Sequence, residues 1–451
     1  MKKRILGAIA LVGLASVSLA ACDKKDNGIT VTFWNTMGDN LQTVLKEAID
    51  GFHEHFPDVK IESTQIGGYD DVKSQVVAEM STGNYPSMAY CYDDHVAAYN
   101  EAAITYPLND LMKDPEWGFG GSKVPYTVKE SDIIEGFRTD ADTFGDGNIY
   151  TLPFLRSTEV LYYNQTFFEE HDLEVPETWE DLWEVCAQIK TIDPKSTPLG
   201  YDSEANFFIT LCEAYGYDYT TANSTTTAGH FLFDNPQTNA MVAKLKDYFD
   251  KGYFTTQTLY GAYTSGLFAT TNENKCYMCI GSSAGASYQF SSNFTANIAK
   301  LPKAKNGKSA AISQGPSLVF FDKGNSEEIK YAWLFAQYLL TPEIQASFAL
   351  TSGYMPVTTP ATEVAAYKTK MGTAGNDNKD NFATLSIKTA LSQKDSYFTS
   401  DVFVGSSDAR DQVGALIPTV LSDATITADN KTAKIKAHFE AAVKKCVYLA
   451  G

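Results

Sequence analysis

One stretch of the chain has the spelling of a catalytic motif, Gly281-Ser-Ser-Ala-Gly285. The pattern GxSxG is typical of a nucleophile elbow, and Asp408 and His438 follow Ser283 in the order of a hydrolase triad. However, His438 lies in the charged helical segment KIKAHFEAAVKK, and no oxyanion-loop motif precedes the serine. A turn of small residues at a helix start explains the same letters, because its free N–H groups can bind a ligand oxygen. We therefore predict ligand binding at Ser283, not hydrolysis.

Metal or redox chemistry would need clustered cysteines, and the chain has one CxxC motif, Cys276-Tyr-Met-Cys279. This motif lies in a predicted strand, where residues three apart point to opposite faces of a sheet. The six cysteines after Cys22 are widely spaced and mostly have apolar neighbours, which predicts buried free thiols. The segment Asp140–Asn148 resembles a calcium loop only superficially, because Phe144 replaces a ligand and Thr151 stands where the bidentate glutamate belongs. We expect a turn there, no metal site and no cofactor.

The first 22 residues predict the compartment. Three basic residues (KKR) precede an apolar run from Ile5 to Leu19, which is typical of a signal peptide and short for a transmembrane helix. The run ends in Leu19-Ala-Ala-Cys22, the pattern of a bacterial lipobox, in which the cysteine is lipidated after cleavage. An ordinary signal peptide with an incidental cysteine is the alternative. We expect residues 1–21 to be removed, Cys22 to anchor an extracytoplasmic protein to the cell membrane, and residues 22–28 to form a tether.

The charge of the chain argues against negatively charged partners. The formal net charge is −19, and the predicted signal peptide holds three bases and no acid, so the remainder carries −22. Such a chain is repelled by nucleic acid and by anionic lipid surfaces. The 26 Tyr and 26 Phe residues suit both hydrophobic cores and stacking against sugar rings. No pair of carboxylates is placed in a pattern that predicts a glycosidase.

The elements that would position these residues alternate between strands and helices. A strand at Ile29–Trp34 is followed by a helix, a second strand and a second helix, which predicts a largely parallel α/β sheet. With 451 residues, the chain is long enough for two or three domains. A long extended run from Tyr150 to Asn164 then leads to a new helix start, where Thr178 can act as the cap and Asp181 stands three residues on. This run predicts a crossing between two lobes.

Nine short stretches have a specific order and spacing over nearly the whole chain after the signal peptide. They are Val31-Thr-Phe-Trp34, Phe56-Pro-Asp-Val-Lys-Ile61, Ser81-Thr-Gly-Asn-Tyr-Pro86, Leu152-Pro-Phe154, Val160-Leu-Tyr-Tyr-Asn164, Pro176-Glu-Thr-Trp179, Ser313-Gln-Gly-Pro-Ser317, Leu340-Thr-Pro-Glu343 and Thr351-Ser-Gly-Tyr-Met-Pro-Val357. Each motif alone is weak. Together they make the chain resemble the extracellular solute-binding proteins (family 1) of bacterial ABC importers.

The resemblance implies an α/β, two-lobed periplasmic-binding-protein fold of type II, in which each lobe is a mostly parallel sheet flanked by helices. The run from Tyr150 to Asn164 would be the first hinge, and the regions of Leu301 and Phe321 the later passes. The implied protein is a monomer that captures a small-molecule solute between closing lobes and delivers it to ABC permease subunits, without catalysis. The implied boundaries are residues 29–152 plus 298–325 for lobe 1, and 153–297 plus 326–451 for lobe 2.

The resemblance also implies which residues contact the solute. Aromatic faces would stack on the apolar side of a sugar, while carboxylates and hydroxyls would take its polar edge. Trp34, Phe208 and Tyr354 could instead be ordinary core residues, and either Asp93 or Asp94 could be a solvated turn residue. The residues that match cleft positions are Trp34, Tyr69, Asp93, Ser157, Phe208, Ser283, Gly315 and Tyr354.

Arginines narrow the choice of solute. The layout is most similar to glycerol-3-phosphate and oligosaccharide binders, and the former carry a late arginine for the phosphate where this chain has Phe403. After the signal peptide the chain holds Arg138, Arg156 and Arg410. Arg156 or Arg410 could offer a fork to an anion, or Arg156 could simply pair with an acid. We therefore expect a carbohydrate, with glycerol 3-phosphate or another polar solute as the alternative.

Overall fold

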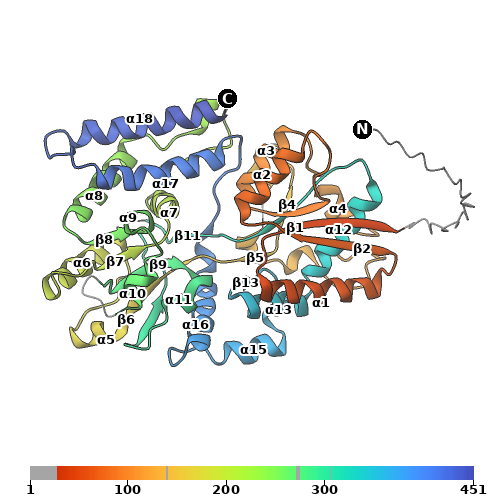
Figure 1. The fold of residues 1–451 in the computed structure, drawn as a ribbon, viewed down its shortest axis with the longest axis horizontal. Helices are drawn as coiled ribbons and strands as arrows, with labels where there is room; N and C mark the ends of the chain where they lie inside the picture. Colours follow the sequence, from red (N-terminus) through yellow and green to blue (C-terminus); the bar gives the residue numbers. More distant parts are fainter. Residues whose placement is uncertain (1–27, 139–140, 271–274, 306, 451) are drawn as a thin grey trace, which may run out of the picture.

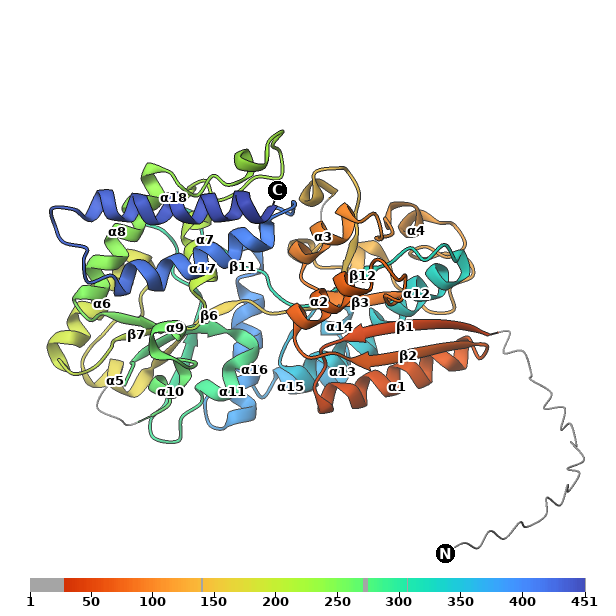
Figure 2. The ribbon, with the colours of Figure 1, turned by 45° about the horizontal axis from the view of Figure 1, so that its top comes forward.

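The computed structural model describes residues 28–450 apart from 139–140, 271–274 and 306, and these residues form two lobes (Figures 1 and 2). Each lobe is built on a five-stranded sheet with helices packed against it. Lobe 1 carries the first strands, and lobe 2 carries the long helices near the C-terminus. Within the described residues, every helix is too short or too polar to cross a bilayer.

The sheet of lobe 1 has the strand order β2-β1-β3-β12-β4. Strands β1, β2 and β3 run parallel, as the alternation of strands and helices predicted, whereas β12 is antiparallel to β3 and β4. The antiparallel strands are those next to the crossings between the lobes. The strands are β1 (Ile29–Asn35), β2 (Val59–Gln65), β3 (Met88–Cys91), β4 (Thr151–Pro153) and β12 (Ser317–Phe320).

Helices surround this sheet, and the apolar faces of the longest ones cover it. In α1, Val44, Leu45, Ala48 and Phe52 recur at helical spacing and are buried. The helices of lobe 1 are α1 (Asp39–His55), α2 (Tyr69–Glu79), α3 (Val96–Glu101), α4 (Asn109–Lys113), α12 (Ser326–Leu339), α13 (Pro342–Ser352), α14 (Thr359–Thr362) and α15 (Ala365–Met371).

The sheet of lobe 2 has the order β10-β6-β9-β7-β8. Strand β6 continues from the crossing and pairs antiparallel with both β9 and β10, while β7 is parallel to β8 and β9. The end of the predicted crossing, Leu161–Asn164, therefore lies in the sheet of lobe 2. The strands are β6 (Glu159–Asn164), β7 (Leu199–Tyr201), β8 (Phe254–Thr256), β9 (Met278–Ser282) and β10 (Ala296–Ala299).

The helices of lobe 2 cover both faces of its sheet (Figure 1). The predicted cap of α6 is present: the Thr178 hydroxyl accepts a hydrogen bond from the Asp181 N–H at 3.1 Å, and the Asp181 carboxylate accepts one from the Thr178 N–H. These helices are α5 (Gln165–Glu170), α6 (Trp179–Ile192), α7 (Glu204–Tyr215), α8 (Pro236–Asp250), α9 (Gln257–Tyr260), α10 (Ser265–Phe268), α11 (Ala286–Gln289), α16 (Lys379–Ser392), α17 (Ser406–Ser422) and α18 (Lys431–Ala450).

The chain passes between the lobes three times, at residues 154–158, 313–316 and 372–378. Two short strand pairs lie at these passes. Strand β5 (Leu155–Arg156) pairs antiparallel with β13 (Met355–Pro356), and β11 (Ala311–Ile312) pairs parallel with β14 (Tyr397–Phe398). The first pass lies where the sequence predicted it. The second lies between the two predicted regions, because Leu301 is buried in the core of lobe 2 and Phe321 already follows a strand of lobe 1.

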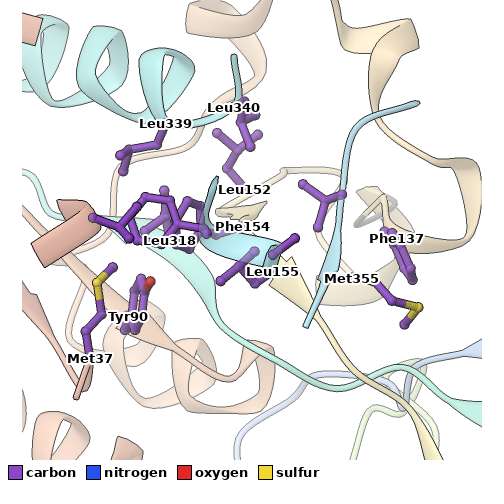
Figure 3. Close-up of a cluster of buried hydrophobic side chains, with 14 of the residues drawn as sticks. Met37, Tyr90, Phe137, Leu152, Phe154, Leu155, Leu318, Leu339, Leu340 and Met355 are labelled. Atoms are coloured by element: carbon purple, nitrogen blue, oxygen red, sulfur yellow. The ribbon is translucent and has the colours of Figure 1, made fainter. Parts of the chain in front are cut away.

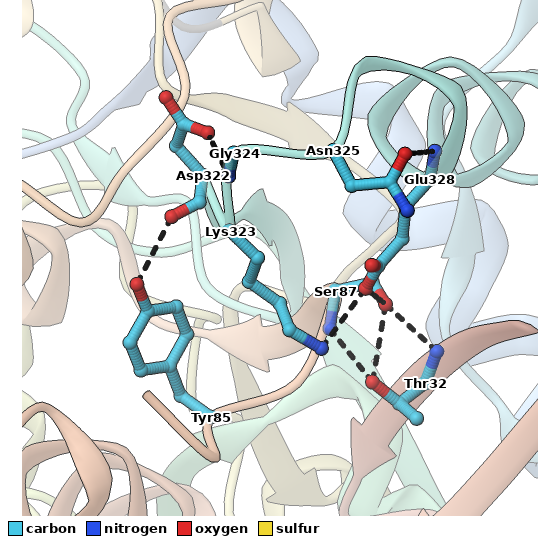
Figure 4. Close-up of polar contacts among 8 residues, drawn as sticks. All are labelled: Thr32, Tyr85, Ser87, Asp322, Lys323, Gly324, Asn325 and Glu328. Carbon is cyan, nitrogen blue, oxygen red and sulfur yellow. Dashed lines mark hydrogen bonds and ion pairs between the residues drawn. The ribbon is translucent and has the colours of Figure 1, made fainter. Parts of the chain in front are cut away.

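The predicted lobe boundaries need one main correction, because α12 and α13 belong to lobe 1. The ring of Phe335 on α12 contacts Phe33 of β1 and Phe52 of α1, with centroids 6.3 and 5.2 Å apart. Figure 4 shows a polar network that fixes the start of the same helix: the Ser87 hydroxyl donates to Glu328, which also pairs with Lys323 at 3.0 Å. Residues 298–312 lie with lobe 2 instead.

A buried apolar cluster holds the base of the first crossing (Figure 3). Phe154 and Leu155 have almost no exposed surface and lie among Leu152, Leu318 and Met355. This packing anchors both crossing strands to lobe 1, so the polar residues that follow are held at a defined place between the lobes.

Candidate functional site

A cavity between the lobes, which we call the polar cavity, receives residues from both lobes and from the first two crossings. It contains about 660 Å³ of empty space, part of it open to solvent. Lobe 1 contributes the end of β3 and the short 3₁₀ turn Asp93–His95, and lobe 2 contributes α7, α17 and the loop before α17. Its lining residues are Tyr92, Asp93, Asp94, Arg156, Ile209, Tyr219, Thr220, Ile312, Ser313, Gln314, Gly315, Thr399, Ser400, Asp401, Ser406 and Arg410.

Arg156 ties the two crossing strands together at the wall of the polar cavity. Its guanidinium donates to the carbonyl oxygens of Leu155, Gly315 and Pro316 at 3.2, 3.3 and 2.8 Å, and to the Ser317 hydroxyl at 2.8 Å. The carboxylate of Asp93 lies 3.8 Å from Nη2. Only 3 % of Arg156 is exposed. Most of its donors are therefore used inside the protein, which leaves little capacity for a bound anion.

Gly315 is the point where the two crossings come closest. Its φ is +137°, and a Cβ atom there would lie 2.3 Å from the carbonyl oxygen of Leu155. A side chain would therefore collide with the backbone of the other crossing, and glycine is required.

Several residues that line the polar cavity carry a buried polar atom without a hydrogen-bond partner among the described residues. These atoms are Asp93 Oδ1, Asp94 Oδ1, Ser313 Oγ and Ser406 Oγ. An unpaired buried polar atom is costly, so such groups are expected to meet a ligand or water. The carboxylates can accept hydrogen bonds and the hydroxyls can both donate and accept, which is the chemistry that recognises a polyhydroxylated solute.

Arg410 reaches the polar cavity from α17. Its guanidinium donates to Asn206 Oδ1, and the same amide group exchanges hydrogen bonds with the side chain of Gln314 at 2.7 and 3.1 Å. Arg410 and Gln314 both line the cavity. Asn206 therefore helps to hold both side chains in place at the cavity.

A second cavity, which we call the tyrosine cavity, adjoins the first on the lobe 1 side of the crossings. It is lined by Tyr69, Tyr90 and Tyr354 together with Leu155 and Pro316 of the two crossings. Tyr69 stacks on Tyr92 with ring centroids 4.2 Å apart, so aromatic rings continue from one cavity to the other. Burial raises the pKa of Tyr69 and of Tyr354, which keeps both phenols neutral and able to donate hydrogen bonds.

The lobes also touch at the rim of the cleft. Lys73 of α2 donates a hydrogen bond of 3.1 Å from Nζ to the Ser407 hydroxyl at the start of α17. A solute in the polar cavity would therefore lie between elements that contact each other across the lobes.

Comparison with known proteins decides the family. Residues 47–427 match the model of a bacterial extracellular solute-binding protein family. The chain belongs to this family. Its members are the substrate-binding components of ABC importers, so the chain is a solute-binding protein and not an enzyme, as the motif analysis predicted.

The curated relatives of this solute-binding protein include sn-glycerol-3-phosphate-binding periplasmic proteins. UgpB of Yersinia pestis is 28% identical over 352 residues, covering 75% of this chain and 77% of the relative. UgpB of Escherichia coli K12 is 27% identical over 358 residues, covering 77% and 78%.

Solved structures share the fold. UgpB of Mycobacterium tuberculosis, in complex with glycerophosphocholine, has a TM-score of 0.71 at 20% identity over 92% of this chain and 98% of that one. The GacH receptor of Streptomyces glaucescens, solved without ligand and with acarbose, has a TM-score of 0.68 at 17% identity over 93% and 99%. The prediction of a type II periplasmic-binding-protein fold is confirmed.

Five of the nine predicted site residues line one of the two cavities. Asp93, Arg156 and Gly315 line the polar cavity, and Tyr69 and Tyr354 line the tyrosine cavity. Asp94, which the sequence left open as a turn residue, lines the polar cavity beside Asp93. The contact of these residues with a bound solute stays a prediction.

The other four predicted residues lie elsewhere. Phe208 is fully buried in the core of lobe 2, because its place on α7 faces Phe233 and Phe439 rather than the cleft. Trp34 packs on the lobe 1 core beside α2. Ser157 and Ser283 make hydrogen bonds that hold the first crossing in place. Ser157 pairs with Gln314 through backbone hydrogen bonds, and the Ser283 hydroxyl accepts a hydrogen bond from the Thr158 N–H at 3.2 Å.

The groups singled out for other chemistry have structural partners. His438 pairs with Asp423 at 3.1 Å, so its imidazole is engaged away from Ser283. Cys276 and Cys279 are free and buried, as predicted, and no cluster of three potential metal ligands occurs in the described part of the chain. In the segment that resembles a calcium loop, Asp146 accepts hydrogen bonds from Asn148 N–H and the Tyr150 hydroxyl, while Asp140 lies outside the described residues.

The sequence missed Tyr92 and Gln314, which line the polar cavity, and Asn206, which contacts Arg410 there. It named Arg410 only as a possible fork for an anion. Asn206 carried a signal: it is a polar residue in the apolar helical run EANFFITLCEAY, and such a residue needs a buried partner. Phe403, in the place of the expected arginine, stacks on His230 with ring centroids 4.5 Å apart and is buried.

Proposed function

We propose that this solute-binding protein captures a neutral carbohydrate in the polar cavity and delivers it to an ABC permease. The observation that carries the proposal is the set of unpaired buried oxygens at the cavity, from Asp93, Ser313 and Ser406. Sugar hydroxyls can donate to the carboxylate and exchange hydrogen bonds with the two serines. The neighbouring tyrosine cavity supplies the aromatic surface on which sugar rings stack.

The charges at the cavity support a neutral solute. Two arginines and three aspartates line it: Arg156, Arg410, Asp93, Asp94 and Asp401. Four donor contacts occupy Arg156, and Phe403 stands in the core instead of presenting a guanidinium. A doubly charged phosphate would therefore meet more negative than positive charge.

Glycerol 3-phosphate is the second candidate, and Arg410 favours it. Its guanidinium lines the cavity near the first turn of α17, where free N–H groups and the helix dipole attract anions. The relatives named for sn-glycerol 3-phosphate support this alternative.

A thermal-shift screen separates the two candidates. Maltose, maltotriose, sn-glycerol 3-phosphate and glycerophosphocholine would each be added over a range of concentrations. A solute at a hundred times its Kd stabilises the protein by about 2.7 kcal/mol, which gives a clear rise in Tm. We expect a shift with an oligosaccharide. A shift only with the phosphorylated solutes would assign the site to the second candidate, and a shift only with a protein partner would favour an adhesin-like role.

We further propose that the protein works as a monomer and that a lipid on Cys22 anchors it. The sequence Leu19-Ala-Ala-Cys22, which has the pattern of a lipobox, supports the anchor. A lipid anchor would hold the receptor close to its permease outside the cytoplasm. Expression in a bacterial host with radiolabelled palmitate tests this. The wild type is expected to be labelled and to sediment with membranes, and Cys22→Ser is expected to be unlabelled. Equal labelling of both proteins would contradict the anchor.

A further inference from the structure

A buried carboxylate lies directly behind the polar cavity. Glu159 is the first residue of β6, one residue past the crossing, and only 2 % of it is exposed. Its Oε2 accepts a hydrogen bond of 2.6 Å from the Tyr201 hydroxyl, and its Oε1 accepts one of 3.0 Å from Asn206 Nδ2. No described ion pair includes Glu159 within 4 Å. Its negative charge is therefore held by two neutral donors.

The side-chain amide of Asn206 links the carboxyl group of Glu159 to two side chains that line the cavity. Its Nδ2 group donates to Glu159 and to Gln314 Oε1, and its Oδ1 accepts from Gln314 Nε2 and from Arg410. Both donor hydrogens and both acceptor positions are thus used. The ionised carboxylate and the guanidinium both require this orientation, because a flipped amide would turn its oxygen toward the carboxylate and its NH₂ group toward Arg410.

Protonation of Glu159 removes its part of that constraint. A protonated carboxyl group keeps an acceptor oxygen and gains a donor, so it can also donate to Asn206 Oδ1 once the amide has turned, and Oδ1 then no longer accepts from Arg410. If the amide turns, its NH₂ group faces the guanidinium, which has no acceptor to offer. Arg410 would then lose its support and move within the cavity.

We propose that Glu159 is a positioning residue for the solute site, which holds Arg410 and Gln314 in place through Asn206 when ionised and releases them when protonated. The effect on solute affinity rests on the proposed function of the polar cavity. The proposal about side-chain positions does not.

The surroundings of Glu159 place this change near neutral pH. Burial raises the pKa of Glu159 to about 7. The hydrogen bonds from Tyr201 and Asn206 and the positive charge of Arg410 lower the pKa, but by less than burial raises it. The remaining charged neighbour is Asp202 on the loop after β7, which raises it. The neutral side chain of Gln393, the residue after α16, donates a hydrogen bond to the backbone carbonyl of Glu159 and not to its carboxylate. The position of Arg410 is therefore expected to depend on pH within the range in which bacteria live.

Arginine-selective NMR tests the positions directly. The chain has four arginines, so ¹⁵N,¹³C-arginine labelling gives few guanidinium signals, and Arg410→Lys identifies the one that matters. Between pH 5.5 and 8.5 we expect the Arg410 signal of the wild type to shift with a midpoint near 7. In Glu159→Gln the signal should not titrate. Asn206→Ala cuts the link while leaving Glu159 in place, so there too the titration should vanish.

A matched control distinguishes this network from a general effect of pH. Glu180 also accepts a hydrogen bond from a tyrosine hydroxyl, that of Tyr215, but lies on the other side of lobe 2 from the cavity. Glu180→Gln should leave the Arg410 titration unchanged. An Arg410 signal that is constant with pH in the wild type, or that titrates equally in Glu159→Gln, would overturn the proposal.

Affinity for maltose, measured by calorimetry at pH 5.5 and 8.5, supplies the functional arm. We expect wild-type binding about tenfold weaker at the lower pH, the loss that one hydrogen bond to a charged group produces, and no such dependence in Glu159→Gln. If maltose fails to bind at either pH while Arg410 still titrates, the carbohydrate assignment is wrong and the positioning role stands. If maltose binds equally at both pH values although Arg410 titrates, Glu159 positions Arg410 without affecting the solute, and the expected effect on affinity is wrong.

Discussion

Glu159 also makes a sharp prediction about stability. Its pKa lies at about 7 in the folded protein, against a usual value of 4.5, because burial disfavours the charged form. The folded state therefore holds a proton that the unfolded chain has already released between these two values. Stability is then highest at low pH in this window and falls as pH rises toward 7. The full shift corresponds to about 3 kcal/mol, of which about 2 kcal/mol falls between pH 5.5 and 8.

The substitution that tests this is Glu159→Gln, which keeps the size of the side chain and removes its titration. Urea unfolding would be followed by tryptophan fluorescence, to which the buried Trp179 and Trp183 of lobe 2 contribute. The free energy of unfolding of the variant minus that of the wild type should rise by about 2 kcal/mol from pH 5.5 to 8. Other titrating groups are common to both proteins and largely cancel in this difference. A difference that is the same at both pH values would refute the reasoning.

Three further substitutions test separate parts of the structure. Arg156→Met removes the donor of four hydrogen bonds, three to carbonyl oxygens of the crossings and one to the Ser317 hydroxyl. The free energy of unfolding should therefore fall by about 3 kcal/mol in a urea titration, whereas the exposed Arg138→Met should change it little. Asp93→Asn replaces a carboxylate at the cavity by its neutral isostere. Maltose binding, measured by calorimetry, should weaken about tenfold while the Tm of the free protein stays nearly constant. An unchanged affinity would show that Asp93 does not contact the solute. Thr178→Ala removes the cap of α6 and should cost about 1 kcal/mol by the same urea assay, more than Thr191→Ala on the exposed side of that helix.

Local signals in the sequence were enough to predict the elements around the first crossing. The polar residues Thr178 and Asp181 form the predicted capping box because the interaction spans only three residues. The extended run before them became β4, β5 and β6, since its apolar and β-branched residues pack on both lobes. Such predictions succeed where the chain nearby contains all the partners.

The lobe to which a helix belongs depends on distant partners. The buried face of α12, with Trp333 and Phe335, could pack against either sheet. The helical spacing of its apolar residues indicates only that one face of the helix is covered. It joins lobe 1 because β12, which precedes it, lies inside that sheet. The sequence placed the region of β12 in lobe 1 but assigned the helices after residue 325 to lobe 2.

The site was predictable only in part for the same reason. Phe208 and Tyr69 are both aromatic and both matched cleft positions, yet one faces a core and the other faces a cavity. That difference comes from how α7 is rotated against α17 and α18, which no local pattern encodes. Arg410 and Asn206 are 204 residues apart in the chain, so their contact could not be inferred from spacing.

The central claim is that the polar cavity binds a neutral carbohydrate between the lobes. Calorimetric titration of the protein with maltose and, separately, with sn-glycerol 3-phosphate, each at low and high salt, tests it most directly. We expect saturable binding of the sugar that depends little on salt, because hydrogen bonds and stacking rather than charge provide the affinity. Binding of the phosphate alone, weakened by salt and lost in Arg410→Lys, would contradict it.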